Sequence, residues 1–466
     1  MSYALTSVVL PGPLHQSLLA HLFPGDGLEA AALLLCRRVG NHRQRYLVHD
    51  TILVPHSACT RREPDALSWP GEYAEQAIDR ADEGDYSIVA LHSHPGGFFN
   101  FSSQDDASHT LLLPALFQAT DKPSLSAIMV PSGAMRVRIF NGRDPYQPVD
   151  QVICARDDIH VWPAGADVGP SVPAVPIAFT QGMRHSLSRL CACVIGASGT
   201  GSIVAEQLAR LGFGEIILID FDRIEARNLD RILNSTTADA ADGKLKVEML
   251  KDAIRRYSPK CRVHAVPESI ATRDAILAAC EADVLFSCVD TAEGRHIADR
   301  LAAACCMPLF NVGVSIPTRQ EGTERRIAEV CGRIDFVQPG GATLLDRDVY
   351  SPATLEAEYL ARVAPEAHQR RVAEGYLKGI AEQAPAVISL NMRAASATVM
   401  EFIARAFPFR HNSNRDFART IFMLADGEEE HFGEGSFRSN EALPLCTGLH
   451  EPLLGLPALA PRRKAA

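Results

Sequence analysis

The stretch from His92 to Asp105 reads His-Ser-His-Pro-Gly-Gly-Phe-Phe-Asn-Phe-Ser-Ser-Gln-Asp, and it follows an apolar run over residues 86–91. That run predicts a buried strand, whose two-residue period places His92 and His94 on one face. The Pro-Gly-Gly that follows ends the strand, and the polar run from Ser102 predicts a helix start. Two imidazoles and a carboxylate that meet at one point suit Zn²⁺ with a fourth position open for water. A histidine pair alone is usually structural, but the complete pattern predicts a metal site.

This stretch resembles the signature of the JAMM metalloproteases, JAB/MPN-type enzymes that are mostly isopeptidases acting on ubiquitin-like proteins. The family adds a glutamate on an early strand, and Glu29, which precedes an apolar run, matches it in kind and order. Taken alone, Glu29 reads as a solvated residue before a strand, and the motif favours a catalytic role. The resemblance implies zinc ligands at His92, His94 and Asp105, with Glu29 as general base and Ser102 as a stabiliser of the tetrahedral oxyanion.

Length and composition limit the classes of protein to consider. A chain of 466 residues predicts two or three domains, and 47% hydrophobic with 22% charged residues is ordinary for a soluble globular protein. A net charge of -10 offers no basic surface for nucleic acid. The 12 cysteines show no disulfide spacing, which favours a cytoplasmic location. No apolar run reaches about 18 residues and the N-terminus lacks a basic region, so neither a membrane span nor export is expected.

A second pattern begins with the apolar strand 191–195, which leads into a loop containing Gly196, Gly199 and Gly201. A helical pattern and a second apolar strand follow, and this strand ends at Asp220. Glycines let the backbone approach phosphate, and the N-terminus of the next helix favours its negative charge. The order predicts a nucleotide-binding βαβ unit, although the glycine loop alone does not separate NAD from ATP.

Polar residues further along distinguish these cofactors. The run Asp-Phe-Asp-Arg-Ile-Glu-Ala-Arg-Asn-Leu-Asp-Arg occupies 220–231, Lys246 lies about one helix length on, and a third apolar strand ends at Asp290. This order resembles the E1-like adenylyltransferases, the family of ThiF, MoeB and the ubiquitin-activating enzymes, with Ile224 in place of a valine. A dehydrogenase has no need of this ordered set.

The resemblance implies a Mg·ATP site with specific roles for these residues. Asp220 holds the ribose hydroxyls and Asp290 binds Mg²⁺. The phosphates are engaged by Asn228, Arg231 and Lys246. Fixed cations must neutralise the oxygens when a carboxylate attacks the α-phosphate, so Arg231 and Asp290 are also predicted as catalytic. The complete predicted nucleotide site comprises Gly196, Gly199, Gly201, Asp220, Asp222, Asn228, Arg231, Lys246 and Asp290.

The predicted architecture combines α+β and α/β classes. Residues 1–150 form a JAMM/JAB domain with a mixed sheet and flanking helices, and 151–176 form a Pro/Gly-rich linker. Residues 177–411 form a Rossmann-like E1/ThiF adenylation domain, and 412–466 a C-terminal extension. Many relatives carry a CxxC pair where this chain has 340–346 without cysteine, so no structural zinc is predicted. No cysteine lies between Cys331 and Cys446, and neither of these two is expected to form a thioester.

Both predicted activities can act on the same substrate, a ubiquitin-like or sulfur-carrier protein that ends in glycine. The first hypothesis is a bifunctional enzyme of a bacterial ubiquitin-like pathway, which trims or removes the carrier and adenylates its terminal glycine. Conjugation would add an E2-like partner, and relatives of the second module predict a homodimer. The alternatives are sulfur-carrier activation for thiamine, molybdopterin or cysteine synthesis, a scaffold with one inactive module, and an NAD-dependent oxidoreductase.

Overall fold

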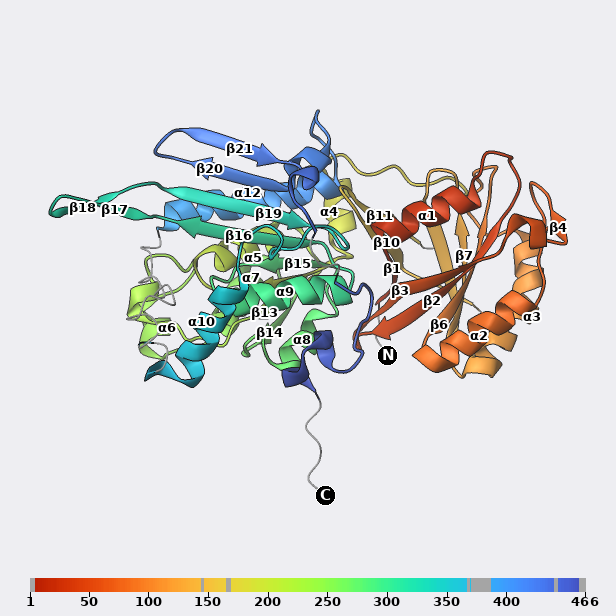
Figure 1. Cartoon of the computed structure of the whole chain (residues 1–466), viewed down its shortest axis with the longest axis horizontal. Helices are drawn as coiled ribbons and strands as arrows, with labels where there is room; N and C mark the ends of the chain where they lie inside the picture. The colour runs from red at the N-terminus through yellow and green to blue at the C-terminus, as the bar shows by residue number, and fades with distance from the viewer. Residues whose placement is uncertain are drawn as a thin grey trace, which may run out of the picture. The chain divides into compact units, whose positions relative to one another are not determined.

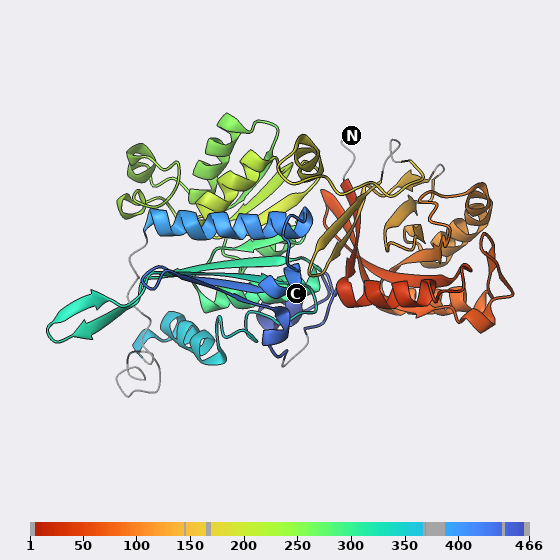
Figure 2. The same cartoon turned by 90° about the horizontal axis from the view of Figure 1, so that it is seen from above.

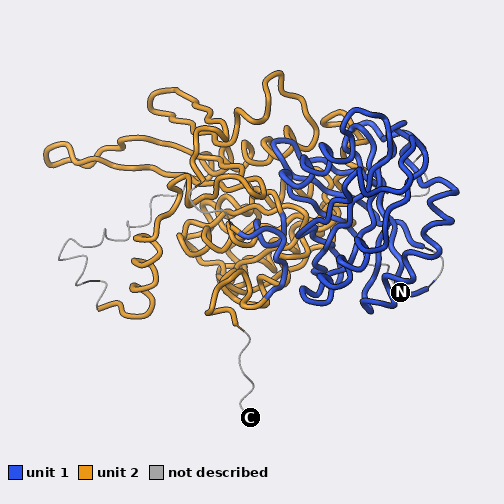
Figure 3. The backbone as a smooth tube through the Cα atoms, turned by 45° about the vertical axis from the view of Figure 1, so that its right-hand side comes forward, with its two compact units in different colours: residues 1–175, 303–306, 444–450 blue, residues 176–302, 307–443, 451–466 orange. Residues whose placement is uncertain are grey.

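The structure is a computed structural model that describes residues 5–143, 146–164, 169–366, 369, 387–439 and 443–460. Its backbone divides into two compact units (Figure 3). The first comprises Met1–Val175, Ala303–Cys306 and Pro444–His450, and the second comprises Pro176–Ala302, Met307–Leu443 and Glu451–Ala466. Each unit combines a sheet with helices, which confirms the predicted fold classes.

The first unit is built on a nine-stranded mixed sheet in the order β11-β10-β1-β3-β2-β6-β7-β8-β9 (Figure 1). Its strands are β1 (Leu5–Pro11), β2 (Ala31–Val39), β3 (Arg43–Leu53), β6 (Ser87–Ser93), β7 (Ser124–Met129), β8 (Met135–Phe140), β9 (Gln147–Pro148), β10 (Gln151–Ala155) and β11 (Ile159–Pro163). Its helices are α1 (Gly12–Leu22), α2 (Glu72–Gly84) and α3 (Ser103–Thr120), and a small hairpin pairs β4 (Arg61–Arg62) with β5 (Leu67–Ser68).

The central strand β2 is buried on both faces over residues 31–36, which explains the unbroken apolar sequence of this part. Leu34 packs in one core cluster with Leu18 of α1. Its neighbour Leu33 packs in another with Ala77 of α2 and Leu113 of α3. The sheet is therefore covered by α1 on one side and by α2 and α3 on the other. This packing fixes β6, the partner of β2, at the centre of the unit.

The second unit carries an eight-stranded sheet in the order β14-β13-β12-β15-β16-β19-β20-β21. The first five strands in this order are parallel to one another. Figure 2 shows α12 lying alongside α5. The strands are β12 (Cys191–Ile195), β13 (Glu215–Ile219), β14 (Arg262–Val266), β15 (Val284–Ser287), β16 (Leu309–Ser315), β19 (Cys331–Val337), β20 (Arg419–Met423) and β21 (Glu428–Phe432), with a separate hairpin of β17 (Thr318–Glu321) and β18 (Glu324–Ile327). The helices include α4 (Gln181–Leu187), α5 (Gly199–Leu211), α6 (Thr237–Ala241), α7 (Lys246–Tyr257), α8 (Arg273–Ala279), α9 (Ala292–Ala304), α10 (Pro352–Val363) and α12 (Ile388–Ala406).

The chain order reverses at β12. From β12 the chain moves to β13 and β14 on one side, then returns to β15 and β16 on the other. In such sheets ligands bind beyond the carboxyl ends of the strands at this switch point. The glycine-rich loop follows β12 directly, so it lies at the position where a nucleotide is expected.

Two predicted boundaries are wrong. The linker predicted over 151–176 starts too early, because β10 pairs in parallel with β1 and β11 pairs with β10, so both strands extend the first sheet. The extension predicted over 412–466 contributes β20 and β21 to the second sheet, where β20 pairs with β19. In both cases pairing with a strand distant in the chain, β1 or β19, makes the segment part of a sheet.

Candidate metal centre and nucleotide site

The structure brings the three predicted metal ligands of the first unit together. His92 lies on β6, His94 directly follows that strand, and Asp105 lies in the first turn of α3. The Nε2 atoms of the two histidines are 3.0 Å apart. The Asp105 carboxylate lies 2.9 Å from His92 Nε2 and 3.4 Å from His94 Nε2. The strand break at Pro95 and the helix start after Ser102 produce this convergence from separate elements.

Glu29 completes the cluster from the segment just before β2, the strand that pairs with β6. One oxygen of Glu29 and one nitrogen each of His92 and His94 lie within 4.8 Å of one another. The backbone of Glu29 is fixed on both sides, because its N–H donates to Glu63 O and its carbonyl accepts from Arg62 Nε, each at 2.9 Å. Burial raises the pKa of Glu29 to about 7. A carboxyl group with this pKa can accept and release a proton near neutral pH.

The hydrogen bonds around the cluster orient its donor atoms. His94 Nδ1 lies 2.8 Å from the carbonyl oxygen of Phe98, which can only accept, so Nδ1 carries the proton and Nε2 presents a lone pair. Asp105 Oδ2 accepts from the backbone N–H of Ser102 at 2.6 Å and from its hydroxyl at 2.8 Å. Burial opposes ionisation of Asp105, yet its hydrogen bonds with His92 and His94 hold its pKa below the usual range.

The donor set fits Zn²⁺. A tetrahedral zinc with bonds of about 2.1 Å to nitrogen and oxygen has ligand–ligand distances of ~3.4 Å. The observed separations of 3.0, 2.9 and 3.4 Å among His92, His94 and Asp105 are close to this value. Three protein donors with an adjacent carboxylate, Glu29, are typical of a catalytic rather than a structural zinc site, because the fourth position is left for water.

Ser102 lies at the helix start that the sequence predicts, and it also restrains Asp105, which sequence reasoning did not include. It is the N-cap of α3, where its Oγ accepts from the backbone N–H of Asp105 at 3.1 Å while Asp105 bonds back to Ser102. This capping box both starts the helix and fixes the rotamer of Asp105. The oxyanion role that the family resemblance implies for Ser102 stays a prediction.

Sequence reasoning also missed His109, which lies next to His92. The ring of His109 on α3 lies 6.1 Å from that of His92, and His109 bonds to Ser126 Oγ at 3.0 Å. Burial and the neighbouring Arg138 lower the pKa of His109 to about 3, so it stays neutral. The spacing of four residues between Asp105 and His109 was the available signal, because it places both on one helix face.

In the second unit, the glycine loop has the tight geometry that its sequence predicts. Gly196 has φ +88, and a Cβ on it would come within 2.9 Å of Cys288 O. A Cβ on Gly201 would overlap the carbonyl oxygen of Gly196, and one on Gly199 would overlap the side-chain nitrogen of Asn391. Asn391 belongs to α12, nearly two hundred residues later in the chain, so no local pattern pointed to it.

Asp220 and Asp222 connect this loop to α7. The two Asp220 oxygens accept from the N–H groups of Ala197 and Asp222 at 2.7 and 2.8 Å. Lys246, the first residue of α7, is buried and lies 2.6 Å from Asp222 Oδ2. Burial raises the pKa of Asp220, and the nearby Lys246 charge opposes this shift. A lysine ammonium is thus held close to the glycine loop.

Asn228 and Arg231 follow in one short turn. Asn228 is buried, and its Oδ1 accepts from Glu225 N at 3.0 Å. Arg231 Cδ lies 3.7 Å from the position of a Cβ on Gly199, and its Nη1 donates to Arg227 O. Arg231 therefore lies beside the loop that would receive the phosphates.

Asp290 lies at the same edge of the sheet. It follows β15 and is exposed, and Cys288, two residues earlier, contacts the glycine loop through Gly196. Sequence reasoning missed Arg295 on α9, whose buried Nε has no hydrogen-bond partner among the described residues. Arg295 and Arg333 both approach Gly313 of β16, each 3.9 Å from the position of its Cβ. Burial lowers the pKa of both arginines, and the charge of Arg333 lowers the pKa of Arg295 further.

Comparisons with known proteins agree with this division. Residues 11–139 match the family model for prokaryotic homologs of the JAB domain, and residues 174–392 match that of the ThiF family. Ubiquitin-like modifier-activating enzyme 5 of Drosophila persimilis is 30% identical over 159 residues, 32% of this chain and 38% of that protein. The tRNA threonylcarbamoyladenosine dehydratase of Haemophilus influenzae is 40% identical over 79 residues, 17% of this chain and 30% of that protein. The chain thus matches about a third of the length of these curated relatives.

Among solved structures, E. coli MccB with ATP has a TM-score of 0.42 and 18% identity, covering 56% of this chain and 68% of that one. Within the described part of the chain, no helix has the length and apolar character needed to cross a membrane. The two family matches coincide with the two sites described above. The chain is a fusion of a JAB-like domain with a ThiF-family, E1-like domain.

Proposed function

We propose that this chain is a bifunctional enzyme of a bacterial ubiquitin-like protein pathway. One site would hydrolyse a peptide or isopeptide bond at the carrier's C-terminus, and the other would adenylate its terminal glycine with ATP. The observation that carries the proposal is the convergence of Glu29, His92, His94 and Asp105 in a chain that also has a ThiF-family domain. The similarity to enzymes named for activating ubiquitin-like modifiers supports a carrier protein as substrate.

In the hydrolytic reaction, His92, His94 and Asp105 would hold Zn²⁺. When bound, Zn²⁺ supplies a Lewis acid that polarises the scissile carbonyl and lowers the pKa of water towards about 7. Glu29 accepts a proton as the water oxygen bonds to the carbonyl carbon. It then gives that proton to the leaving nitrogen as the C–N bond breaks. The pKa of Glu29, raised by burial to about 7, suits both steps.

In the adenylation reaction, the terminal carboxylate of the carrier bonds to the α-phosphorus of ATP, and pyrophosphate leaves. The glycine loop would cradle the phosphates through its backbone. Arg231 and Lys246 would neutralise charge on the phosphate oxygens, and Asp290 would hold Mg²⁺. Arg295, with no hydrogen-bond partner for its buried Nε among the described residues, is available for the carrier's carboxylate.

Two alternatives use the same residues differently. In a sulfur-carrier pathway, the adenylated glycine is passed to a sulfur donor, whereas in conjugation an E2-like partner takes the carboxyl group. In a scaffold, one of the modules would lack activity. We expect the ThiF-family domain to form a homodimer and the protein to act in the cytoplasm without nucleic acid.

The test is ATP–pyrophosphate exchange with each small β-grasp-like carrier encoded beside this gene. Asp290→Ala should abolish exchange, whereas Asp426→Ala, an exposed acid in the turn after β20, should retain it. His94→Ala should abolish peptide cleavage and zinc content together while leaving exchange intact. If every neighbouring carrier fails to support exchange by the wild-type protein, the second unit is a scaffold and the proposal fails.

A further inference from the structure

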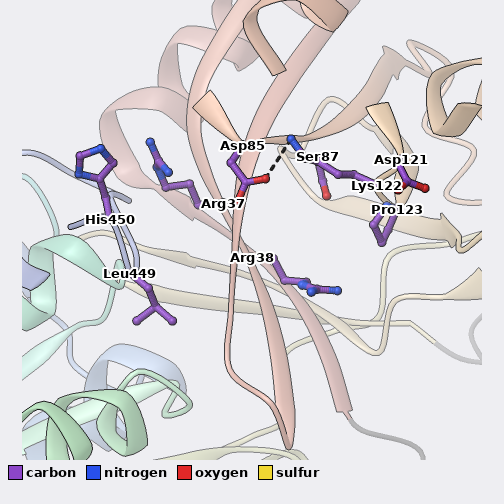
Figure 4. Close-up of a pocket in the computed structure, with 9 residues that line it drawn as sticks. All are labelled: Arg37, Arg38, Asp85, Ser87, Asp121, Lys122, Pro123, Leu449 and His450. Atoms are coloured by element: carbon purple, nitrogen blue, oxygen red, sulfur yellow. Dashed lines mark ion pairs between the residues drawn. The ribbon is translucent and has the colours of Figure 1, made fainter. Parts of the chain in front are cut away.

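The first unit has a polar cavity of about 390 Å³ away from the metal cluster, and its lining residues all belong to that unit (Figure 4). The end of β2 contributes Arg37 and Arg38, the turn between α3 and β7 contributes Lys122, and the segment near the C-terminus contributes His450. Arg37 follows Ala31, the first residue of β2 beside the metal cluster, by six positions along an extended strand. The cavity is thus about 20 Å from that cluster.

Cationic side chains in this cavity are held in place before any ligand binds. The guanidinium of Arg37 stacks on the ring of Tyr86 at 4.7 Å and donates to its hydroxyl at 3.3 Å. Tyr86 in turn stacks on His49, whose Nδ1 bonds to Leu445 O at 3.0 Å. Lys122 Nζ donates to Ala81 O, at the end of α2, at 3.0 Å. Side chains that are already fixed lose little entropy when a ligand binds.

The positive charge is only partly compensated. Two carboxylates, Asp85 and Asp121, line the cavity. Asp85 pairs with Lys122 at 3.0 Å, but its side chain is 88% exposed, so solvent screens its charge, and Asp121 is exposed as well. Among the described residues, no carboxylate forms an ion pair with Arg37 or Arg38, and the buried Arg37 Nε has no hydrogen-bond partner. Guanidinium groups form paired hydrogen bonds to tetrahedral and planar oxyanions. Two guanidinium groups, one ammonium group and the Ser87 hydroxyl supply more hydrogen-bond donors and positive charge than a single carboxylate requires.

We propose that this cavity binds a small molecule through a phosphate group. Arg38 contacts the phosphate oxygens, Arg37 from the other face of β2 and Lys122 add positive charge, and Pro123 and Leu449 provide the apolar wall for the rest of the ligand. The volume is in the range of small-molecule sites. This inference does not depend on the proposed function.

The experiment is calorimetric titration of the full chain with inorganic phosphate, and separately with succinate as a carboxylate probe. Lys246→Met serves as the background that weakens phosphate binding at the adenylation site. In that background we expect saturable phosphate binding, weakened at least about tenfold by Arg38→Gln, because a charge-assisted hydrogen bond contributes about 1.5–3 kcal/mol. Arg38 is exposed, so its replacement leaves the core intact.

Two further variants control the result. Arg61→Gln, an exposed arginine on β4, should bind phosphate like its parent. Arg37→Lys keeps the positive charge and loses only the forked donor, so it should bind phosphate like its parent. Equal phosphate affinity with and without Arg38→Gln overturns the proposal. Tighter binding of succinate than of phosphate also overturns it, because the cavity would then be a carboxylate site.

Discussion

Replacing Ser102 with alanine separates two roles for this residue. In the structure, Ser102 Oγ accepts from Asp105 N at 3.1 Å and donates to Asp105 Oδ2 at 2.8 Å, so one substitution removes both the helix cap and one restraint on a metal ligand. The backbone N–H of Ser102 still donates to the same carboxylate oxygen at 2.6 Å, so Asp105 stays near the site with less restraint.

The expected magnitudes follow from these contacts. Loss of an N-cap hydroxyl costs about 1 kcal/mol of unfolding free energy, which lowers the melting temperature of a 150-residue unit by about 2–4 °C. Loss of a hydrogen bond to a metal ligand weakens metal binding by about 10–100-fold. Ser102→Ala should therefore show both a lower melting temperature without metal and weaker zinc binding.

Ser351→Ala is the matched control. Ser351 caps α10 through the same kind of capping box, its Oγ accepting from Thr354 N at 3.2 Å, but it lies in the second unit. Ser351→Ala should lower the free energy of unfolding by a similar amount and leave the zinc affinity unchanged. Zinc affinity is measured by competition with a chromophoric chelator, and stability by calorimetry of the metal-free protein. If Ser102→Ala binds zinc like wild type but loses peptidase activity, Ser102 acts on the substrate oxyanion and our reasoning about Asp105 is refuted.

Three further predictions test other parts of the structure. Glu29→Gln should lower peptide cleavage by about 10²–10⁴-fold while the zinc content measured by mass spectrometry stays at one equivalent, because the amide cannot accept the proton; cleavage at the wild-type rate would exclude Glu29 as the base. Gly201→Ala should abolish ATP–pyrophosphate exchange and destabilise the protein by about 1–3 kcal/mol, because its Cβ would overlap Gly196 O; Gly435→Ala, where no atom lies near the added Cβ, is a control for overpacking. Burial raises the pKa of Asp299 to about 7, against about 3.9 in an unfolded chain, so its stabilising contribution is complete below about pH 4 and lost as pH rises through 7. The melting temperature of wild type should thus fall between pH 5 and pH 8 relative to Asp299→Asn, and parallel pH curves would contradict this.

Local sequence patterns predicted the elements that carry most of the chemistry. The apolar run before His92, the Pro-Gly-Gly break and the polar start at Ser102 correspond to β6, a turn and α3. These signals are local because a strand period, a strand breaker and a capping residue each act within a few positions. The same holds for β12, the glycine loop and α5 in the second unit.

What the sequence could not predict depends on contacts between distant segments. The predicted Pro/Gly-rich linker included β10, whose partner strand β1 lies about 140 residues earlier in the chain. Asn391 meets Gly199 across 192 positions of the chain, and Arg295 and Arg333 meet only where both approach β16. The pKa of Glu29 likewise depends on its burial, which no property of the residue itself indicates.

The central claim is that one chain first exposes a carrier's terminal glycine and then activates it. It is tested most directly by mass spectrometry of a carrier precursor extended beyond that glycine, incubated with the full chain, Zn²⁺ and Mg·ATP. We predict loss of the extension followed by addition of AMP, with His94→Ala leaving the precursor intact and Asp290→Ala leaving it trimmed but not adenylated. A precursor trimmed equally well by His94→Ala, or a trimmed carrier adenylated equally well by Asp290→Ala, would contradict the account.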